Sequence, residues 1–220
     1  MRKFVIMGAQ GSGKGTQAKL LCAEYDLVHI SVGDMFRWHI QNHTKLGAKV
    51  KRIVAAGQLV PDDLVYDVVS ERLALHDWNY GFLLDGFPRN VTQGEFFLEA
   101  YDIDAVIDIE VPRQVVIQRI LSRRLCSVCG LDYNLIFHRP AQSDTCDVCK
   151  GRLVQRQDDT PEAVEARLRD YDEKTRPILD LFRRKEYVVT VDGTRTPEEA
   201  QKEVRRKLGA LLEARLAAVP

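Results

Sequence analysis

Residues 3–16 read KFVIMGAQGSGKGT, an apolar run followed by a glycine-rich loop. The run has the length of a strand and is apolar on both faces, as buried parallel strands are. The glycines let the backbone curl so that its N–H groups point at phosphate oxygens, and the start of a helix adds its positive dipole end. Strand, loop and helix in this order predict a P-loop rather than a glycine turn without a ligand, with Lys14 reaching the outer phosphates. Gly15, where the general pattern has Ser or Thr, is a departure, and Thr16 comes next.

The rest of the chain repeats the alternation of strand and helix that residues 3–25 begin. Short apolar, β-branched segments of strand length lie at 3–8, 28–31, 81–85, 105–110 and 188–192. Apolar residues at helical spacing lie at 13–25, 62–76, 91–100, 112–124, 161–184 and 197–216. Thr160 and Thr196 each precede a proline and are expected to cap the last two helices, with Glu199 completing a capping box. This alternation predicts an α/β fold with a five-stranded parallel sheet and helices on both faces.

Two stretches interrupt the alternation. Residues 31–60 read as short helices without a strand of their own, and residues 125–157 contain cysteine, aspartate and glycine without helical periodicity. We expect both to be insertions that cover a ligand, because α/β proteins place such elements beside the site.

Composition limits the possible partners and the compartment. The chain has 220 residues, which allows one or two domains, and 32 basic residues balance 32 acidic ones. A neutral chain argues against dedicated binding to nucleic acid or to a membrane surface. No run approaches the roughly 18 apolar residues of a membrane span, and the N-terminal apolar stretch is too short for a signal peptide. A cytoplasmic location is therefore expected, with cysteines that are reduced or bound to metal.

Four of the five cysteines form two knuckles, Cys126-x2-Cys129 and Cys146-x2-Cys149. This spacing predicts a closed four-thiolate zinc site that is structural rather than catalytic. A pair of disulfides and a zinc ribbon that binds nucleic acid are the alternatives. Arg139 is the one Lys or Arg between the outer cysteines, which disfavours the ribbon. Cys22 lies outside the pattern and is expected to be an inert core residue.

The phosphate loop, GxxxxGKGT, resembles that of the nucleoside monophosphate kinases, and further elements resemble the adenylate kinase family. In chain order they are Gly33-Asp34-Met35-x-Arg37, Gln58-Leu59-Val60, Asp85-Gly86-Phe87-Pro88-Arg89 with Gln93, Arg119 with Arg123-Arg124, Arg156-x-Asp158-Asp159, Arg167 and Asp192-Gly193-Thr194. They cover nearly the whole chain and together are highly specific.

The resemblance implies a P-loop NTPase-like core of residues 1–30, 61–121 and 160–220. Residues 31–60 would bind the monophosphate, and residues 122–159 would form a zinc-held lid. The implied reaction is MgATP + AMP ⇌ 2 ADP, with Mg²⁺ accompanying ATP and Zn²⁺ in the lid. Other implied properties are a monomeric state and the absence of nucleic-acid and membrane partners.

The same resemblance assigns roles to individual residues. The catalytic cations would be Lys14, Arg89, Arg119, Arg123, Arg156 and Arg167. ATP would contact Gly11, Ser12, Gly13, Lys14, Gly15, Thr16, Arg119, Arg123, Asp132, Tyr133, Thr194 and Arg195. AMP would contact Val32, Arg37, Gln58, Leu59, Val60, Gly86, Phe87, Pro88, Arg89, Gln93, Arg156 and Arg167. Asp85 would act through the second shell of Mg²⁺, Pro88 would follow a cis peptide, and Cys126, Cys129, Cys146 and Cys149 would hold zinc.

Several positions depart from the family pattern. Val32 replaces a threonine, Gln58 replaces a lysine, and Gln10 replaces a proline in the loop, a change expected to be minor. Because Gln93 offers both a donor and an acceptor to an adenine edge, AMP stays the expected acceptor. The alternatives are a kinase with another base, such as a GTP:AMP or UMP/CMP kinase, and a non-catalytic zinc-ribbon protein that binds nucleotides. Phe137 is expected to be a core residue.

Overall fold

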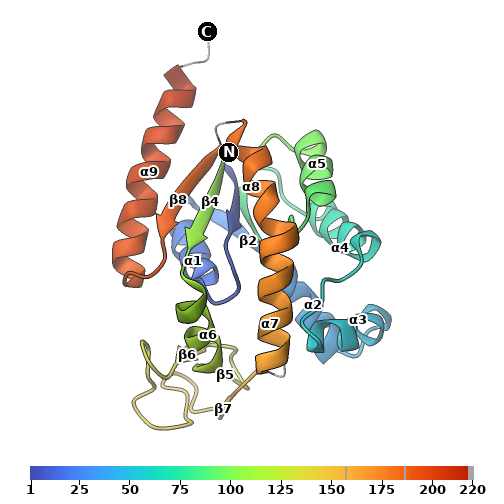
Figure 1. Ribbon diagram of the computed structural model, residues 1–220, viewed down its shortest axis with the longest axis vertical. Helices are drawn as coiled ribbons and strands as arrows, with labels where there is room; N and C mark the ends of the chain where they lie inside the picture. Colours follow the sequence, from blue (N-terminus) through green and yellow to red (C-terminus); the bar gives the residue numbers. More distant parts are fainter. Residues whose placement is uncertain (157, 186, 218–220) are drawn as a thin grey trace.

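The computed structural model describes residues 1–156, 158–185 and 187–217. Its main sheet is parallel and has the strand order β2-β3-β1-β4-β8 (Figure 1). These strands are β1 (Lys3–Met7), β2 (Leu27–Ser31), β3 (Gly81–Asp85), β4 (Ala105–Glu110) and β8 (Val188–Asp192). The predicted five-stranded parallel sheet is therefore confirmed.

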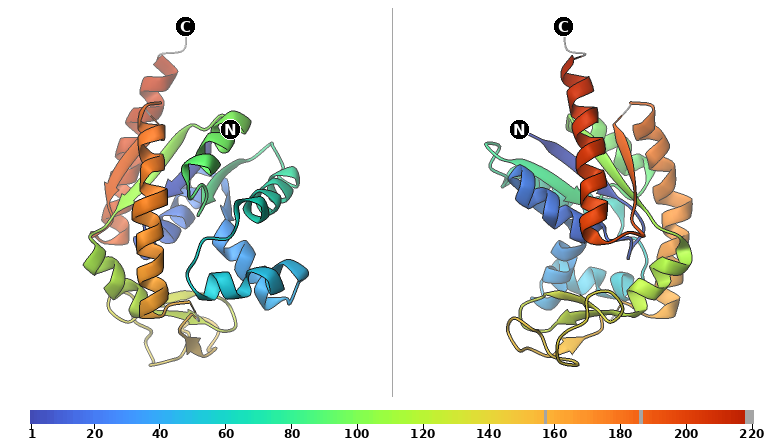
Figure 2. Two further views of the ribbon diagram at one scale, coloured as in Figure 1. Left: turned by 45° about the vertical axis from the view of Figure 1, so that its right-hand side comes forward. Right: turned by 90° about the vertical axis from the view of Figure 1, so that its left-hand side faces the viewer.

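Alternate residues of each strand belong to two separate hydrophobic cores, one on each face of the sheet. Phe4 and Ile6 of β1 pack against α1 (Lys14–Tyr25) and α9 (Pro197–Ala217). Val5 and Met7 belong to the larger core on the other face. That core includes residues of α2 (Val32–Gln41), α3 (Lys45–Ala55), α4 (Asp62–Ala74), α5 (Val91–Ala100) and α8 (Arg176–Arg183). Both faces are covered, which is why these strands read as continuous apolar runs; Figure 2 shows the two layers of helices.

The predicted helix caps are present. Thr160 Oγ1 accepts a hydrogen bond from Ala163 N at 3.2 Å at the start of α7 (Pro161–Asp170). At the start of α9, Glu199 N donates to Thr196 Oγ1 at 3.3 Å, and Thr196 N donates to Glu199 Oε2 at 3.1 Å. This reciprocal pair is the capping box expected from the sequence.

Two helices differ from their predicted extent. The helix predicted at 112–124 is α6 (Arg113–Leu121), and the chain turns into strand β5 at Arg123. The helix predicted at 161–184 is interrupted by a π-helical turn, Tyr171–Thr175. There, Arg176 N donates to Tyr171 O, five residues earlier. Pro177 follows and has no N–H, so the α-helical pattern of backbone hydrogen bonds could not continue unchanged at this point.

The two interruptions of the alternation lie at one end of the molecule, away from both chain ends (Figure 1). After β2 the chain forms α2 and α3, as the sequence predicts. After α6 it forms a small antiparallel sheet of order β6-β5-β7, from β5 (Arg123–Cys126), β6 (Asp132–Asn134) and β7 (Leu153–Val154). Among the described residues, no helix is both long and apolar enough to cross a membrane.

Candidate functional site: a phosphate cleft and a cysteine cluster

The phosphate loop depends on glycines that no other residue could replace without movement. Gly8, Gly11 and Gly13 have φ values of 139°, 82° and 96°. A Cβ on Gly8 would lie 2.6 Å from Ile109 O, and one on Gly11 would lie 2.7 Å from Ile120 Cγ1. Gly13 precedes α1, whose first N–H groups have no partner within the helix. The loop therefore presents backbone donors at a positive helix end, as the sequence predicts.

Lys14, the first residue of α1, is surrounded by other charged groups. Removal from water lowers the pKa of Lys14 to about 8; Asp85 opposes this shift, and Arg89, Arg123 and Arg37 add to it. Repulsion of this kind requires the cations to lie near one another. The structure thus brings these residues together at the phosphate loop, although Lys14 and Arg123 are 109 positions apart in the sequence.

Asp85 ends β3 beside the phosphate loop. Burial raises the pKa of its carboxyl group, but His29, Lys14 and Arg89 outweigh burial, so the net pKa lies below its usual value. His29 Nε2 is 3.5 Å from Asp85 Oδ2, and a Cβ on Gly15 would be 3.9 Å from the same oxygen. An ionised carboxylate therefore faces the loop, and a carboxylate is a group that can hold Mg²⁺ or its bound water.

Arg37 and Arg89 lie beside two neighbouring glycines, Gly33 in the first turn of α2 and Gly86 just after β3. Arg89 Nε donates to Gly86 O at 2.8 Å, and Arg37 is held by Asp34 through Nε at 3.2 Å. A Cβ on Gly86 would lie 3.2 Å from Arg89 Nη2 and 3.8 Å from Gly33 N, so these two turns are close neighbours. Burial lowers the pKa of Arg89, against the opposing effect of Asp85, and Arg167 and Arg37 lower it further.

The backbone of Arg89 follows a cis peptide and accepts a hydrogen bond from a distant segment. The peptide between Phe87 and Pro88 is cis, as expected, and Phe87 is buried in the main core. Thr175 Oγ1, in the π-helical turn, donates to Arg89 O at 2.8 Å. Sequence reasoning missed Thr175, because nothing local to it indicates a contact 86 residues away.

Three further predicted arginines each contact an aspartate. Arg123 pairs with Asp159, Arg156 Nη2 donates to Asp132 Oδ1 at 3.1 Å, and Arg167 bonds Asp158. Arg167 Nη1 also donates to Gln10 Oε1 at 2.5 Å, and Gln10 Nε2 lies 3.5 Å from Asp159 Oδ1. Gln10, expected to be a minor change, therefore joins the phosphate loop to this cluster; its identity alone carries no such signal.

Arg119 contacts backbone carbonyls at the outer side of the loop. Its Nη1 donates to Gly193 O at 2.7 Å and to Ser12 O at 3.2 Å, and its Nη2 lies 3.4 Å from Thr194 O. The guanidinium carbon lies 5.3 Å from the centre of the Phe137 ring. The expectation that Phe137 is a core residue was wrong, because its side chain is 62% exposed. The sequence around Phe137 has no helical or strand periodicity, so it gave no indication that the side chain is exposed.

The four cysteines of the two knuckles meet as predicted. Their sulfurs all lie within 4.8 Å of one another, with Cys126 and Cys149 at 3.3 Å and Cys129 and Cys146 at 3.7 Å. Tetrahedral Zn–S bonds of about 2.3 Å would separate the sulfurs by about 3.8 Å, so the cluster fits zinc. All five cysteines are free thiols, so the alternative of two disulfides is wrong.

Tyr133 belongs to this cluster rather than to the open cleft. The ring is 2% exposed, and its hydroxyl donates to Cys146 Sγ at 3.5 Å and accepts from Asp147 N at 2.7 Å. The hydrogen bond from Tyr133 is the main cause that lowers the pKa of Cys146, which favours a metal-binding thiolate. The hydroxyl of Tyr133 is thus engaged at the cysteine cluster, and the contact between Tyr133 and ATP stays a prediction. Asp132, its neighbour, remains half-exposed between Arg156 and Lys19.

The remaining residues predicted to contact AMP lie in the main core, at its surface or in the first turn of α5. Val32 and Val60 are buried in the main core, while Gln58 and Leu59 line a surface pocket beside α7. Gln93 is 2% exposed, and its Oε1 accepts from Arg89 N at 2.7 Å.

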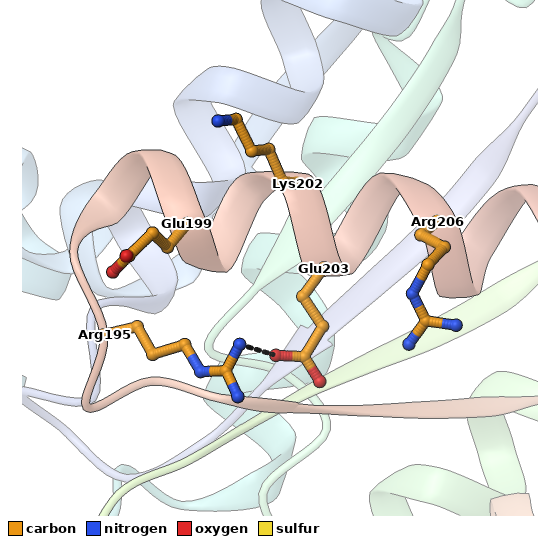
Figure 3. Close-up of a pocket in the computed structure, with 5 residues that line it drawn as sticks. All are labelled: Arg195, Glu199, Lys202, Glu203 and Arg206. Atoms are coloured by element: carbon orange, nitrogen blue, oxygen red, sulfur yellow. Dashed lines mark ion pairs between the residues drawn. The ribbon is translucent and has the colours of Figure 1, made fainter.

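Arg195 lies next to the start of α9. It lines a pocket with Glu199, Lys202, Glu203 and Arg206 of that helix (Figure 3). Arg195 is 3.4 Å from Asp192 and 3.7 Å from Glu203. The contact between Arg195 and ATP stays a prediction, and in this arrangement two carboxylates pair with the guanidinium.

A glycine-rich phosphate loop on a parallel sheet, a carboxylate at the next strand end and arginines gathered from two insertions define a P-loop phosphotransferase of the nucleoside monophosphate kinase type. The family model for adenylate kinase matches residues 6–187. The chain is 42% identical to the adenylate kinase of Clostridium tetani, over 94% of this chain and 99% of that protein. It is 42% identical to the adenylate kinase of Clostridium novyi (90% and 94% covered) and 39% to that of Acetivibrio thermocellus (95% and 99%). The chain therefore belongs to the adenylate kinase family and is a phosphotransferase.

Proposed function

We propose that this chain transfers the terminal phosphoryl group of MgATP to AMP, reversibly, to give two ADP. The observation that carries the proposal is the convergence of cations around the phosphate loop. Lys14 is near enough to Arg37, Arg89 and Arg123 for their charges to lower its pKa, and Arg167 acts on Arg89 in the same way. Local carboxylates such as Asp85 and Asp159 offset part of this positive charge, and a highly anionic ligand such as a nucleotide phosphate would offset more of it.

The reaction needs little covalent chemistry from the protein. The acceptor is already a phosphate oxygen, so no general base is required, and catalysis rests on alignment and charge stabilisation. We assign the donor phosphates to the loop backbone, Lys14 and Arg123, and the acceptor phosphate to Arg37 and Arg89. Arg156 and Arg167 would close on the transferring group, since a planar guanidinium can bind two phosphate oxygens at once.

Mg²⁺ bound with ATP neutralises charge on the phosphate oxygens. Asp85 is the residue that would hold its water shell, because its carboxylate is ionised and faces the phosphate loop at Gly15. His29, on the neighbouring strand β2, approaches this carboxylate with Nε2 at 3.5 Å.

The two insertions would cover the two nucleotides. We assign residues 31–60 to the acceptor, residues 122–159 to the donor, and residues 1–30, 61–121 and 160–220 to the supporting core. Closure of both covers would exclude water and so suppress hydrolysis of ATP. Zinc on Cys126, Cys129, Cys146 and Cys149 would replace the apolar core that so small a lid cannot build.

The test is the formation of nucleoside diphosphates from each pair of ATP or GTP with AMP, GMP, CMP or UMP. We expect ATP with AMP to be the best pair. A better rate with CMP or UMP, or with GTP as the donor, would favour the related kinases that remain as the alternative. No nucleoside diphosphate from any pair would contradict the proposal and leave a non-catalytic binding protein. The proposal includes a cytoplasmic monomer without nucleic-acid or membrane partners, and the molecular mass in solution tests the monomeric state.

A further inference from the structure

The amide of Gln93 is held between a backbone N–H, which can only donate a hydrogen bond, and a carboxylate, which can only accept one. Gln93 lies in the first turn of α5 and is 2% exposed. Its Oε1 accepts from the backbone N–H of Arg89 at 2.7 Å, and its Nε2 donates to Asp62 Oδ1 at 2.6 Å. Asp62 lies in the first turn of α4, the neighbouring helix in Figure 1.

Asn90 completes a closed circuit around this amide. Its Nδ2 donates to both carboxylate oxygens of Asp62, at 2.9 and 3.1 Å. Its Oδ1 accepts from the backbone N–H of Gln93 at 2.8 Å, as the cap of α5. Asn90 therefore fixes the position of the Asp62 carboxylate. The orientation of the Asn90 amide is itself fixed, because its oxygen accepts from the backbone N–H of Gln93.

This circuit determines which end of the Gln93 amide faces which way. A backbone N–H can only donate, and a carboxylate can only accept. If the amide of Gln93 flipped, its oxygen would face the Asp62 carboxylate and its NH₂ group would face the Arg89 N–H. Two hydrogen bonds would be lost and two repulsive contacts would replace them, in a place that water barely reaches.

The fixed amide has consequences for the base it can bind. One N–H of Nε2 and one lone pair of Oε1 remain free after the two internal hydrogen bonds. A 6-aminopurine presents a donor at position 6 and an acceptor at position 1, whereas a 6-oxopurine presents the reverse. For a base held in one position, each purine therefore requires the opposite orientation of the amide.

We propose that Asp62 is a specificity-determining residue, which holds the amide of Gln93 in the orientation that accepts a 6-aminopurine monophosphate and rejects a 6-oxopurine. The proposal rests on the proposed function, because it concerns the acceptor site of that reaction. Asp62 acts through Gln93 and is a positioning residue, not a catalytic one.

The experiment compares AMP with IMP as acceptors, since IMP differs from AMP at the two positions that matter. In Asp62→Asn the side chain can either donate or accept, so one of the two restraints on the amide disappears. We expect the ratio of kcat/KM for AMP over IMP to fall by about tenfold or more, the order expected for relieving one mismatched buried hydrogen bond. Much of the change should be a gain with IMP, which general damage to the site could not produce.

Asp63→Asn is the matched control. Asp63 is exposed, lies in the same first turn of α4 and loses the same charge at the helix start. Its AMP-to-IMP ratio should equal that of the unmodified protein. Asp62→Ser, whose hydroxyl can also donate or accept, is the second variant if Asp62→Asn does not fold.

Two kinds of failure are distinguishable. Absence of ADP from AMP and MgATP in the unmodified protein would refute the proposed function itself. With that activity present, equal use of AMP and IMP by the unmodified protein would overturn the inference about Asp62. A parallel fall with both acceptors in Asp62→Asn, at an unchanged ratio, would overturn it as well.

Discussion

Arg123 donates two hydrogen bonds to the carboxylate of Asp159, from Nε at 2.9 Å and from Nη2 at 2.6 Å. Asp159 is completely buried, and Arg123 begins the small sheet that carries the cysteine cluster. The pair therefore ties the two ends of the segment 122–159 together. It also gives Arg123 a bidentate anion of the kind that a phosphate would offer.

Asp159→Asn should destabilise the ligand-free protein by roughly 1–3 kcal/mol, because Arg123 loses a charged partner in a place with little water. A nucleotide should reduce the loss, since its phosphates then pair with Arg123. Melting temperatures with and without a non-hydrolysable ATP analogue measure both effects. Asp144→Asn is the control, at an exposed position whose φ of 57° suits asparagine. Equal losses with and without nucleotide would contradict this explanation.

Lys14→Met should lower turnover by at least about 10²-fold, because the transferring group loses a cation placed for its transition state. Steady-state rates measure this, with Lys202→Met, an exposed change on α9, as the control. Turnover near normal in Lys14→Met would remove Lys14 from the catalytic machinery.

The pH dependence of the same residue has a definite sign. In the folded chain the pKa of Lys14 is about 8, below its ordinary value of 10.5. As pH rises through about 8, the free enzyme loses this charge, so kcat/KM for MgATP should fall. Between about 8 and 10.5 the unfolded chain binds more protons, so the contribution of Lys14 to the free energy of unfolding should increase with pH. Lys14→Met should abolish that increase, which denaturation at several pH values would detect.

Asp85→Asn should change both the magnesium requirement of the reaction and the pKa of Lys14. The negative charge of Asp85 raises the pKa of Lys14, so its removal should move the alkaline fall in kcat/KM to a lower pH. The Mg²⁺ concentration for half-maximal rate should rise as well, because the carboxylate no longer holds the water shell. Asp26→Asn, an exposed residue at the end of α1, should change neither. An unchanged magnesium requirement would exclude the assigned role.

Metal analysis should give about one zinc per chain, and a chelator should lower the melting temperature, because metal binding contributes directly to folding. Cys146→Ser should have the effect of the chelator. Cys22→Ser changes a cysteine of α1 outside the cluster and should keep full zinc content. A zinc-free protein of undiminished stability would contradict the zinc-held lid.

Most of the sheet could be predicted because its strands are short apolar runs separated by amphipathic helices. Predictions failed where a contact overrides local pattern. The π-helical turn follows from Pro177 in an otherwise regular helix, and Phe137 became exposed because its loop lies against Arg119 rather than in a core. The ion pair of Arg195 with Glu203 likewise could not be predicted from the local pattern.

The sequence by itself determined the phosphate loop, the alternation that builds the sheet, and the cysteine spacing, because each depends on residues close together in the chain. Only the tertiary structure decided which arginines meet, which carboxylates hold them, and how the amide of Gln93 is oriented. These depend on contacts such as Asp62 with Gln93, 31 residues apart, and Arg167 with Gln10, 157 apart. Local periodicity carries no information about such pairs, since packing of the two helical layers on the sheet brings them together.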